Sequence, residues 1–336
     1  MAVPATTAVT ARTIPRAPAS PPTPKLSLTR VSKGRVDHAA WVHIYGPEGV
    51  GKSSFGAATP DPIFIDVEQG TMNLDTTRFV FDEKGRTMPS GFEEFLEAVR
   101  TVEREDHPYK TLVVDTLDAV EALVWRYICE RDNKKNIPDY GWGKGENYVA
   151  LDEWRRLVAA LERVRARGVQ VVTLSHSTVK HFDDPESDGW DRHILKLHDK
   201  AGALVKERAD AVLFARFETV LKKKSTDGQS KKLRAVTTDA RWLYTKHTGA
   251  YDAKNRYDLP EEIPFDWNEL WAAIQAHKPA DSDDLVAAIR EKAARLGDLE
   301  PKALKFLEGA EGDAVKLSKL NVWCNAKLTQ SGRGDE

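Results

Sequence analysis

A glycine-rich turn directly after an apolar segment constrains this chain more than any other feature. Residues 41–45 (WVHIY) predict a buried strand, and the octet GPEGVGKS at 46–53 follows it without a gap. The octet fits the pattern G-x-x-x-x-G-K-[ST], whose glycines let backbone N–H groups wrap a phosphate. Lys52 would supply positive charge to the β- and γ-phosphate oxygens, and the Ser53 hydroxyl would bind Mg²⁺. We therefore expect a site for a nucleoside triphosphate and Mg²⁺. The expected contacts are Gly46, Pro47, Glu48, Gly49, Val50, Gly51, Lys52, Ser53 and Ser54.

Apolar strand patterns alternate with helical patterns along the middle of the chain. We expect strands at 62–66, 78–82, 111–115, 169–176 and 209–217, and helices at 91–105, 117–131 and 150–167. Such alternation implies right-handed crossovers, so the predicted fold class is α/β, with a mostly parallel sheet flanked by helices. Residues 133–148 and 177–199 lack a period and are expected to be loops. The lysine-rich stretch 222–232 predicts an exposed hairpin turn, or simply a solvated edge.

Composition divides the chain into four parts. Residues 1–36 contain six prolines, several basic residues and no acidic residue, which predicts a disordered basic arm. Residues 37–278 hold the expected nucleotide-binding core. Residues 281–328 carry helical patterns and predict a small helical C-terminal module, and residues 329–336 are expected to be a frayed tail.

Composition also excludes several classes of protein. No segment approaches the ~18 consecutive apolar residues that a membrane-spanning helix needs, so we expect no membrane partner. The two cysteines, Cys129 and Cys324, cannot build a disulfide framework, which favours a reducing cytoplasmic compartment. A formal net charge of -2 excludes a globally basic nucleic-acid binder but leaves room for a local basic surface.

Three polar residues at the ends of other expected strands would complete a hydrolytic site. Asp115 closes the strand TLVVD, where an acid would hold the metal and its water shell. Glu68 follows the strand PIFID, and its carboxylate would act as the general base toward water. His176 ends the strand that we expect beside that of Asp115, where it would sense the γ-phosphate. Ordinary alternatives stay open: a helix-capping Asp, a surface Glu and a hydrogen-bonded loop His.

These four elements, in this order, resemble the RecA recombinase superfamily. GPEGVGKSS resembles its phosphate loop, FIDVEQG its strand with the catalytic glutamate, and TLVVDTLDAV its metal-binding strand. The family usually has Gln where His176 stands, so this residue departs from the pattern. ATPases of the AAA+ class normally place Glu directly after the metal-binding Asp, whereas Thr116 follows Asp115 here. The resemblance covers about residues 38–275 and implies ATP as the nucleotide, with Mg²⁺ as its metal.

A narrower resemblance is to phage-type RecA-like ATP-binding proteins that act as single-strand annealing recombinases. The segment AYDAKNRYDLPEEIP at 250–264 adds to it. In RecA-like assemblies, basic residues of this region reach the γ-phosphate of a neighbouring subunit, which implies that role for Lys254 and Arg256. A surface turn before Pro260 is the open alternative. Sites shared between subunits imply a homo-oligomeric ring or filament.

RecA-like proteins hold single strands with two loops, one before and one after the sensor strand, and the segments 133–148 and 177–199 occupy these positions. Their basic and aromatic residues suit phosphate neutralisation and base stacking. The residues expected to bind single-stranded DNA are Lys134, Lys135, Tyr140, Trp142, Lys144, Lys180, Arg192 and Lys196. In the alternative interpretation the rings of the first segment only anchor it to the body. The acidic residues at 183–188 argue against DNA binding along the whole second segment.

Together these inferences predict an ATPase, stimulated by DNA, that converts ATP and water to ADP and phosphate. It would bind single-stranded DNA in phage-type recombination or annealing, and His176 would couple the nucleotide state to the second segment. Two other functions stay open. One is a helicase-like DNA motor with the same core. The other is a nucleotide-switched scaffold whose C-terminal module recruits a partner such as a single-strand-binding protein.

Overall fold

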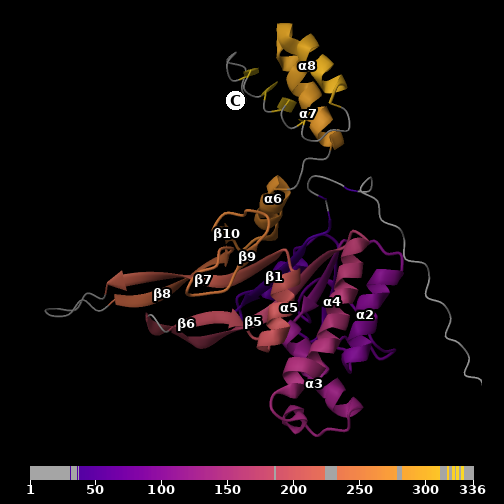
Figure 1. Ribbon diagram of the computed structural model, residues 1–336, viewed down its shortest axis with the longest axis vertical. Coiled ribbons are helices and arrows are strands. Elements are labelled where there is room, and N and C mark those ends of the chain that lie inside the picture. Colours follow the sequence, from indigo (N-terminus) through magenta and orange to yellow (C-terminus); the bar gives the residue numbers. More distant parts are fainter. Residues whose placement is uncertain are drawn as a thin grey trace, which may run out of the picture. The chain divides into compact units, whose positions relative to one another are not determined.

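The structure is a computed structural model that describes residues 38–184, 187–223, 233–277 and 282–310 (Figure 1). It also describes residues 31, 36, 316, 317, 320, 321, 323, 324, 327 and 328. Nearly all of the expected basic arm, most of the lysine-rich turn and the expected tail at 329–336 lie outside the described residues.

Strand β1 (Trp41–Gly46) lies in the middle of a mixed sheet. It pairs in parallel with β5 (Gln170–Asp184) on one side and with β7 (Ala211–Lys223) on the other. The strand order is β10-β8-β7-β1-β5-β4-β2-β3, with β6 paired to β5 and β9 paired to β7. The other strands are β2 (Pro62–Asp66), β3 (Thr77–Arg78), β4 (Thr111–Asp115), β6 (Ser187–Leu195), β8 (Leu233–Tyr244), β9 (Lys254–Asn255) and β10 (Glu262–Pro264).

Helices cover both faces of this sheet because successive strand residues point to opposite sides. In β1, Trp41 and Tyr45 join the apolar cluster made with α2, α3, α4 and α5, whereas Val42 and Ile44 join the cluster made with α1 and α6. The predicted α/β fold, a mostly parallel sheet flanked by helices, is therefore confirmed. The helices are α1 (Lys52–Ala57), α2 (Phe92–Arg104), α3 (Leu117–Arg131), α4 (Ala150–Ala166), α5 (Asp199–Arg208), α6 (Trp267–His277), α7 (Ser282–Arg295) and α8 (Glu300–Glu308).

The expectation of a loop at 177–199 is wrong, because this segment forms an antiparallel β-ribbon. β5 continues past His176, and its residues 177–184 pair with β6. The rings of Phe182 and Trp190 stack at 6.5 Å between centroids, while Val179 stays exposed. A ribbon with solvent on both sides needs no continuous apolar face, so its sequence is as polar as that of a loop. Helix α5, which follows, was not predicted because it buries only small residues and one valine, Val205.

Three smaller differences concern segment ends. The expected loop at 133–148 contains a 3₁₀ turn (Ile137–Tyr140) and the first residues of a π-helical turn (Gly145–Val149). The strand expected at 78–82 is reduced to the two residues of β3. The strand expected at 209–217 continues to Lys223 and pairs antiparallel with β8, as a hairpin requires, although the turn itself lies outside the described residues.

Both long hairpins leave the sheet at the edge where β1 ends. The pairing of β1 with β5 ends at Gly46 and His176, and its pairing with β7 ends at Tyr45 and Phe214. Beyond these points β5 pairs with β6, and β7 pairs with β8. We call the paired strands the β5–β6 arm (residues 177–184 and 187–195) and the β7–β8 arm (residues 215–223 and 233–242). Figure 1 shows both arms extending to the same side of the core. A ligand at the end of β1 would therefore lie at the base of two arms.

Helices α7 and α8 have an apolar cluster of their own. It includes Ile289 and Ala293 of α7, Ala303 and Leu307 of α8, and Cys324. The described part of 281–328 is thus helical, while the predicted domain boundaries stay a prediction. Among the described residues, no helix is long and apolar enough to cross a membrane.

Candidate nucleotide site

The predicted phosphate loop is the turn between β1 and α1. β1 ends at Gly46 and α1 begins at Lys52. Gly49 and Gly51 have φ angles of 75° and 99°, in the left-handed region that favours glycine. A Cβ atom on Gly46 would lie 2.4 Å from the backbone oxygen of Ala215, so a larger residue would collide with β7. A glycine-rich turn before a helix is the arrangement in which backbone N–H groups bind phosphate.

The side chain of Lys52 folds back onto this loop. Its Nζ donates hydrogen bonds to the carbonyl oxygens of Gly46 and Pro47, at 3.1 and 3.0 Å. Burial lowers the pKa of Lys52, and nearby carboxylates, with Asp115 the strongest, oppose that shift. Phosphate oxygens are charged acceptors and form stronger hydrogen bonds than these two carbonyls. We therefore expect Lys52 to exchange these carbonyl oxygens for phosphate oxygens when a phosphate binds.

Ser53 and Asp115 form the part of the site that fits a metal ion. Ser53 Oγ donates to Asp115 Oδ2 at 2.5 Å. Asp115 ends β4 and is 3% exposed, and burial raises its pKa to about 6. A Cβ atom on Gly70 would lie 3.6 Å from Ser53 Oγ and 3.8 Å from Asp115 Oδ2, so glycine leaves space beside this pair. A hydroxyl and a carboxylate are hard oxygen donors, and they fit Mg²⁺ completed by water and phosphate.

Asp66 shapes the turn that carries Glu68. Its buried carboxylate accepts hydrogen bonds from the backbone N–H groups of Glu68 and Gly70 at 3.1 Å, and from that of Thr71 at 2.9 Å. Thr71 Oγ1 also donates to Asp66 at 2.5 Å, and Arg78 donates to Thr71 Oγ1 at 3.0 Å. The Glu68 side chain itself is 35% exposed. A well-bonded turn thus presents a carboxylate that water and substrate can reach.

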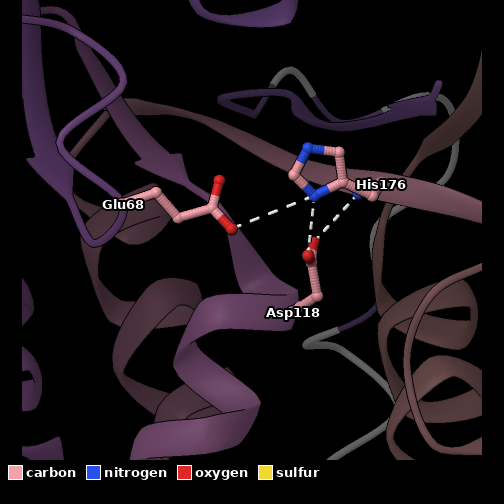
Figure 2. Close-up of side chains that lie close together, drawn as sticks. All are labelled: Glu68, Asp118 and His176. Atoms are coloured by element: carbon pink, nitrogen blue, oxygen red, sulfur yellow. Dashed lines mark hydrogen bonds and ion pairs between the residues drawn. The ribbon is translucent and has the colours of Figure 1, made fainter. Parts of the chain in front are cut away.

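Glu68, Asp118 and His176 converge where the pairing of β5 with β1 ends (Figure 2). Asp118 Oδ1 accepts from the His176 backbone N–H at 2.9 Å, and Asp118 Oδ2 lies 2.7 Å from His176 Nδ1. Glu68 Oε1 lies 3.9 Å from the same nitrogen. The hydrogen bond to Asp118 raises the pKa of His176, and burial opposes it. Burial acts to raise the pKa of Asp118, but the hydrogen bonds from His176 outweigh it and hold that pKa below its ordinary value. The pair therefore favours an imidazolium beside a carboxylate.

No sequence pattern predicted two of the residues found here. Asp118 lies in the first turn of α3. Acidic side chains are common there because they stabilise the helix N-terminus, so an Asp at this position does not by itself indicate a functional site. Only the side-by-side pairing of β4 and β5 brings it to His176. Arg241 of β8 donates to the backbone oxygen of Val50 at 3.1 Å, from a strand 191 residues away in sequence. No local sequence motif predicts a contact between residues so far apart.

Comparison with protein families gives a match to an AAA domain over residues 38–257. This range is more than half of the chain. The chain belongs to the AAA domain family. The matched AAA domain contains the phosphate loop, Glu68, Asp115, Asp118 and His176.

The chain is also similar to individual proteins. The SPbeta prophage-derived uncharacterized protein YorG of Bacillus subtilis (strain 168) is 22% identical over 232 residues, which cover 66% of this chain and 62% of YorG. The chain therefore spans less than two thirds of that relative. Among solved structures, the RadB recombinase is 12% identical with a TM-score of 0.35, and the match covers 68% of this chain and 89% of RadB. A KaiC-like protein from Pyrococcus horikoshii OT3 is 11% identical with a TM-score of 0.35, covering 68% and 85%.

The DNA-binding residues expected at 133–148 of this AAA domain divide into two groups. Tyr140 is anchored, because its hydroxyl lies within hydrogen-bonding distance of two acceptors, the Ile128 carbonyl oxygen at 2.7 Å and the Asp132 carboxylate at 2.8 Å. Lys134 Nζ lies 5.9 Å from the centroid of the same ring. Lys135 and Lys144 are exposed, and the Trp142 side chain is 100% exposed. The interpretation that the rings anchor the segment to the body thus fits Tyr140, whereas the exposed side chain of Trp142 is accessible to a ligand.

The basic residues expected to bind DNA from 177–199 contribute to the base of the β5–β6 arm. Lys180 forms an ion pair with Asp199 at 2.8 Å. Arg192 is 12% exposed, donates to the Thr248 carbonyl oxygen at 2.7 Å and lies 3.3 Å from Asp252. Lys196 is exposed, and its backbone N–H donates to the His176 carbonyl oxygen at 2.9 Å. DNA contact by these residues stays a prediction.

Lys254 and Arg256 lie near the start of β7, at the sheet edge opposite to the phosphate loop. Lys254 Nζ donates to three carbonyl oxygens at the end of α5, at distances between 2.6 and 2.8 Å. Arg256 binds Asp210 Oδ1 at 3.2 Å and the Glu207 carbonyl oxygen at 2.9 Å. These bonds satisfy carbonyls that a helix C-terminus leaves without partners. The role toward a neighbouring subunit stays a prediction.

Proposed function

We propose that this AAA domain is a RecA-like ATPase that hydrolyses ATP to ADP and phosphate with the help of Mg²⁺. One observation carries the proposal: the loop lysine, the hydroxyl–carboxylate pair, Glu68 and His176 all lie at the same edge of the sheet. These groups come from α1, the turn after β2, the end of β4 and the middle of β5, and parallel pairing of β1, β2, β4 and β5 brings them together. Such convergence of a cation, metal ligands and a reachable carboxylate is what phosphoryl transfer to water requires.

In the proposed reaction, a water oxygen attacks the γ-phosphorus and the bond from that phosphorus to the bridging oxygen of ADP breaks. Glu68 accepts the proton that the water loses. Lys52 leaves its two carbonyl partners and stabilises negative charge on the β- and γ-phosphate oxygens. Bound Mg²⁺, held by Ser53 and Asp115, would supply further positive charge. His176 contacts the γ-phosphate through Nε2, the ring nitrogen that Asp118 does not bind.

We further propose that hydrolysis controls binding of single-stranded DNA. His176 is the last residue of β5 that pairs with β1, and the next residue begins the β5–β6 arm. A change in the contacts of His176 on loss of the γ-phosphate would therefore act at the base of this arm. The exposed Trp142 and its neighbouring lysines supply the ring and the charges that hold a flexible strand without reading its sequence. By linkage, single-stranded DNA then strengthens the binding of ATP. Stimulation of turnover by DNA is a further part of the proposal.

The biological process proposed for this activity is phage-type recombination by strand annealing, carried out by a homo-oligomer. Both ideas rest on the resemblance to RecA-like annealing proteins, and the prophage origin of YorG is consistent with the first. Annealing and unwinding are opposite reactions on the same substrates. An assay that follows one labelled strand therefore distinguishes the two functions. An annealing protein incorporates the strand into a duplex, whereas a helicase-like motor releases it from one.

The ATPase proposal is tested with Glu68→Gln, which keeps the size of the side chain and removes its basic carboxylate. We expect turnover to fall at least a hundredfold while Mg-ATP binds as before, because general-base catalysis typically contributes 10²–10⁴-fold. Glu83→Gln, an exposed acid outside the site, is the matched control. Unchanged turnover in Glu68→Gln would remove Glu68 from the reaction.

The DNA proposal is tested by fluorescence anisotropy of a labelled single-stranded oligonucleotide, with and without Mg-ATP, across a salt series. We expect salt-sensitive binding that strengthens with ATP, because phosphate contacts release counterions. Lys52→Ala should lose the response to ATP while keeping the nucleotide-free affinity. A protein that binds ATP but no DNA in either state would instead be a nucleotide-switched scaffold.

A further inference from the structure

A planar cation and an aromatic ring lie together beside the exit of the phosphate loop. The Arg241 guanidinium stacks over the Phe265 ring, with 5.3 Å between its central carbon and the ring centroid. Its Nη1 donates to the Val50 carbonyl oxygen at 3.1 Å. A Cβ atom on Gly51 would lie 2.4 Å from that same nitrogen, so the guanidinium rests directly on the last glycine of the loop. Phe265 in turn packs against Phe55 of α1 at 4.8 Å between ring centroids.

The pair lies on the side of the loop that the reacting groups leave free. Asp115, Glu68 and His176 belong to β4, to the turn after β2 and to β5, which all follow on one side of β1. The γ-phosphate of a bound triphosphate must lie toward those groups. Arg241 belongs to β8, which lies on the other side of β1, beyond β7. A triphosphate that crosses the loop therefore directs its α-phosphate and nucleoside toward Arg241.

We propose that Arg241 and Phe265 form the platform on which the base of the bound nucleotide stacks. This inference rests on the proposed binding of ATP and assigns its nucleoside end, for which the sequence offered no residue. Arg241 is exposed and Phe265 is half-buried, so both are accessible to a ligand. Guanidinium planes and aromatic rings both stack on bases, and stacking tolerates any base because each has a π-face. The platform would thus hold a purine by its face.

The competing interpretation is that Arg241 only braces the loop through the Val50 carbonyl oxygen. The two interpretations differ in which part of the ligand loses affinity when Arg241 is changed. A brace serves the phosphates, so its loss would weaken every ligand of the loop equally. A base platform serves the nucleoside alone, so its loss would spare a ligand that consists of phosphates only.

The test compares the binding of Mg-ATP with that of Mg-tripolyphosphate by isothermal calorimetry on the full chain. The variants are Arg241→Ala, Arg241→Lys and Phe265→Leu, with Lys246→Ala as a matched control that removes an exposed cation just after β8. We expect Arg241→Ala and Phe265→Leu each to weaken ATP about tenfold, a size typical of a lost stacking contact, and to leave tripolyphosphate unchanged. Arg241→Lys should restore little, because lysine keeps the charge but lacks the planar group.

An equal loss for ATP and tripolyphosphate in Arg241→Ala would establish the brace and overturn the platform. Unchanged affinity for both ligands would also overturn it. Failure of the underlying nucleotide site gives a different result, since tripolyphosphate would then bind wild type and Lys52→Ala alike. Full affinity for ATP in Phe265→Leu combined with a loss in Arg241→Ala would remove Phe265 and, with it, the platform as proposed.

Discussion

Asp118 holds both the backbone and the ring of His176, with one carboxylate oxygen 2.9 Å from the backbone nitrogen and the other 2.7 Å from Nδ1. Asp118 lies on α3, the helix that follows β4, and His176 lies at the base of the β5–β6 arm. The pair therefore connects the proposed nucleotide site to the arm. The bound carboxylate also orients the ring, because it occupies Nδ1 and leaves Nε2 as the nitrogen for the proposed contact with phosphate.

Asp118→Asn should lower the pKa of His176 and reduce turnover about tenfold. The carboxylate raises that pKa in the wild type, so the imidazolium persists to higher pH than in the variant. If the charged ring supports hydrolysis, activity falls as pH rises through the pKa of His176, and this decline moves to lower pH in Asp118→Asn. The His176 ring signal in an NMR titration and the pH profile of kcat measure the two effects. Asp152→Asn, an exposed acid on α4, is the control, and a decline that stays in place would separate Asp118 from the chemistry.

Asp115→Asn should stabilise the metal-free protein at pH 8 while abolishing Mg²⁺-dependent turnover. Burial raises the pKa of Asp115 from 3.8 to about 6, so the charged form is disfavoured by folding. This cost is absent below pH 4, grows between pH 4 and 6, and is complete above pH 6, with ~3 kcal/mol as an upper bound. We expect the unfolding temperature in chelator to rise by several degrees at pH 8, and by about half as much at pH 5. Asp106→Asn, at a fully exposed site, should change neither value.

Thr71→Val should slow hydrolysis without weakening nucleotide binding. The substitution keeps the shape of the side chain but removes the hydroxyl that joins Asp66 to Arg78, and so loosens the turn that carries Glu68. Losing a buried hydrogen-bonding partner costs about 1–3 kcal/mol, and we expect kcat to fall at least fivefold. Steady-state kinetics and ATP titration separate the effects on kcat and Kd. Thr101→Val on α2, where the hydroxyl bonds only to its own helix, is the control; a raised Kd with normal kcat would contradict the role assigned to the turn.

The parts of the molecule that the sequence predicted are those that a single pattern determines. Helix α3 was predicted over 117–131 and is Leu117–Arg131, because its start is capped by Thr116 and its apolar period is regular. The phosphate loop was predicted for the same reason: glycine spacing and a preceding buried strand are local properties. Once the loop and α3 are predicted, few topologies remain for the sheet, because parallel strands can be connected in only a few ways.

The parts that the sequence did not predict depend on partners distant along the chain. The β5–β6 arm has no apolar face of its own, so only the pairing of its two strands reveals it. The sequence around Lys254 does not indicate that its ammonium group bonds to carbonyl oxygens at the end of α5, because those residues lie more than 40 positions away. The partnership of Asp118 with His176 likewise arises from strand order rather than from spacing.

Trp142 supports a last prediction, because its backbone conformation is unfavourable for folding and its exposed side chain adds no stabilising burial. Its side chain is fully exposed and its φ angle is 48°, between Gly141 at 72° and Gly143 at 66°. A side chain in this left-handed region costs roughly 1–2 kcal/mol, and such strain is commonly kept where a residue meets a ligand. Trp142→Gly should therefore leave the unfolding temperature unchanged or raise it, while affinity for single-stranded DNA falls five- to twentyfold for one lost stacking contact.

Tyr140→Phe is the reciprocal control for this prediction. It keeps the ring but loses the hydroxyl contacts with Ile128 and Asp132, so it should lower stability and spare DNA binding. Thermal unfolding and anisotropy on the same preparations decide the matter, and DNA affinity that survives in Trp142→Gly would move the proposed DNA contact away from this segment.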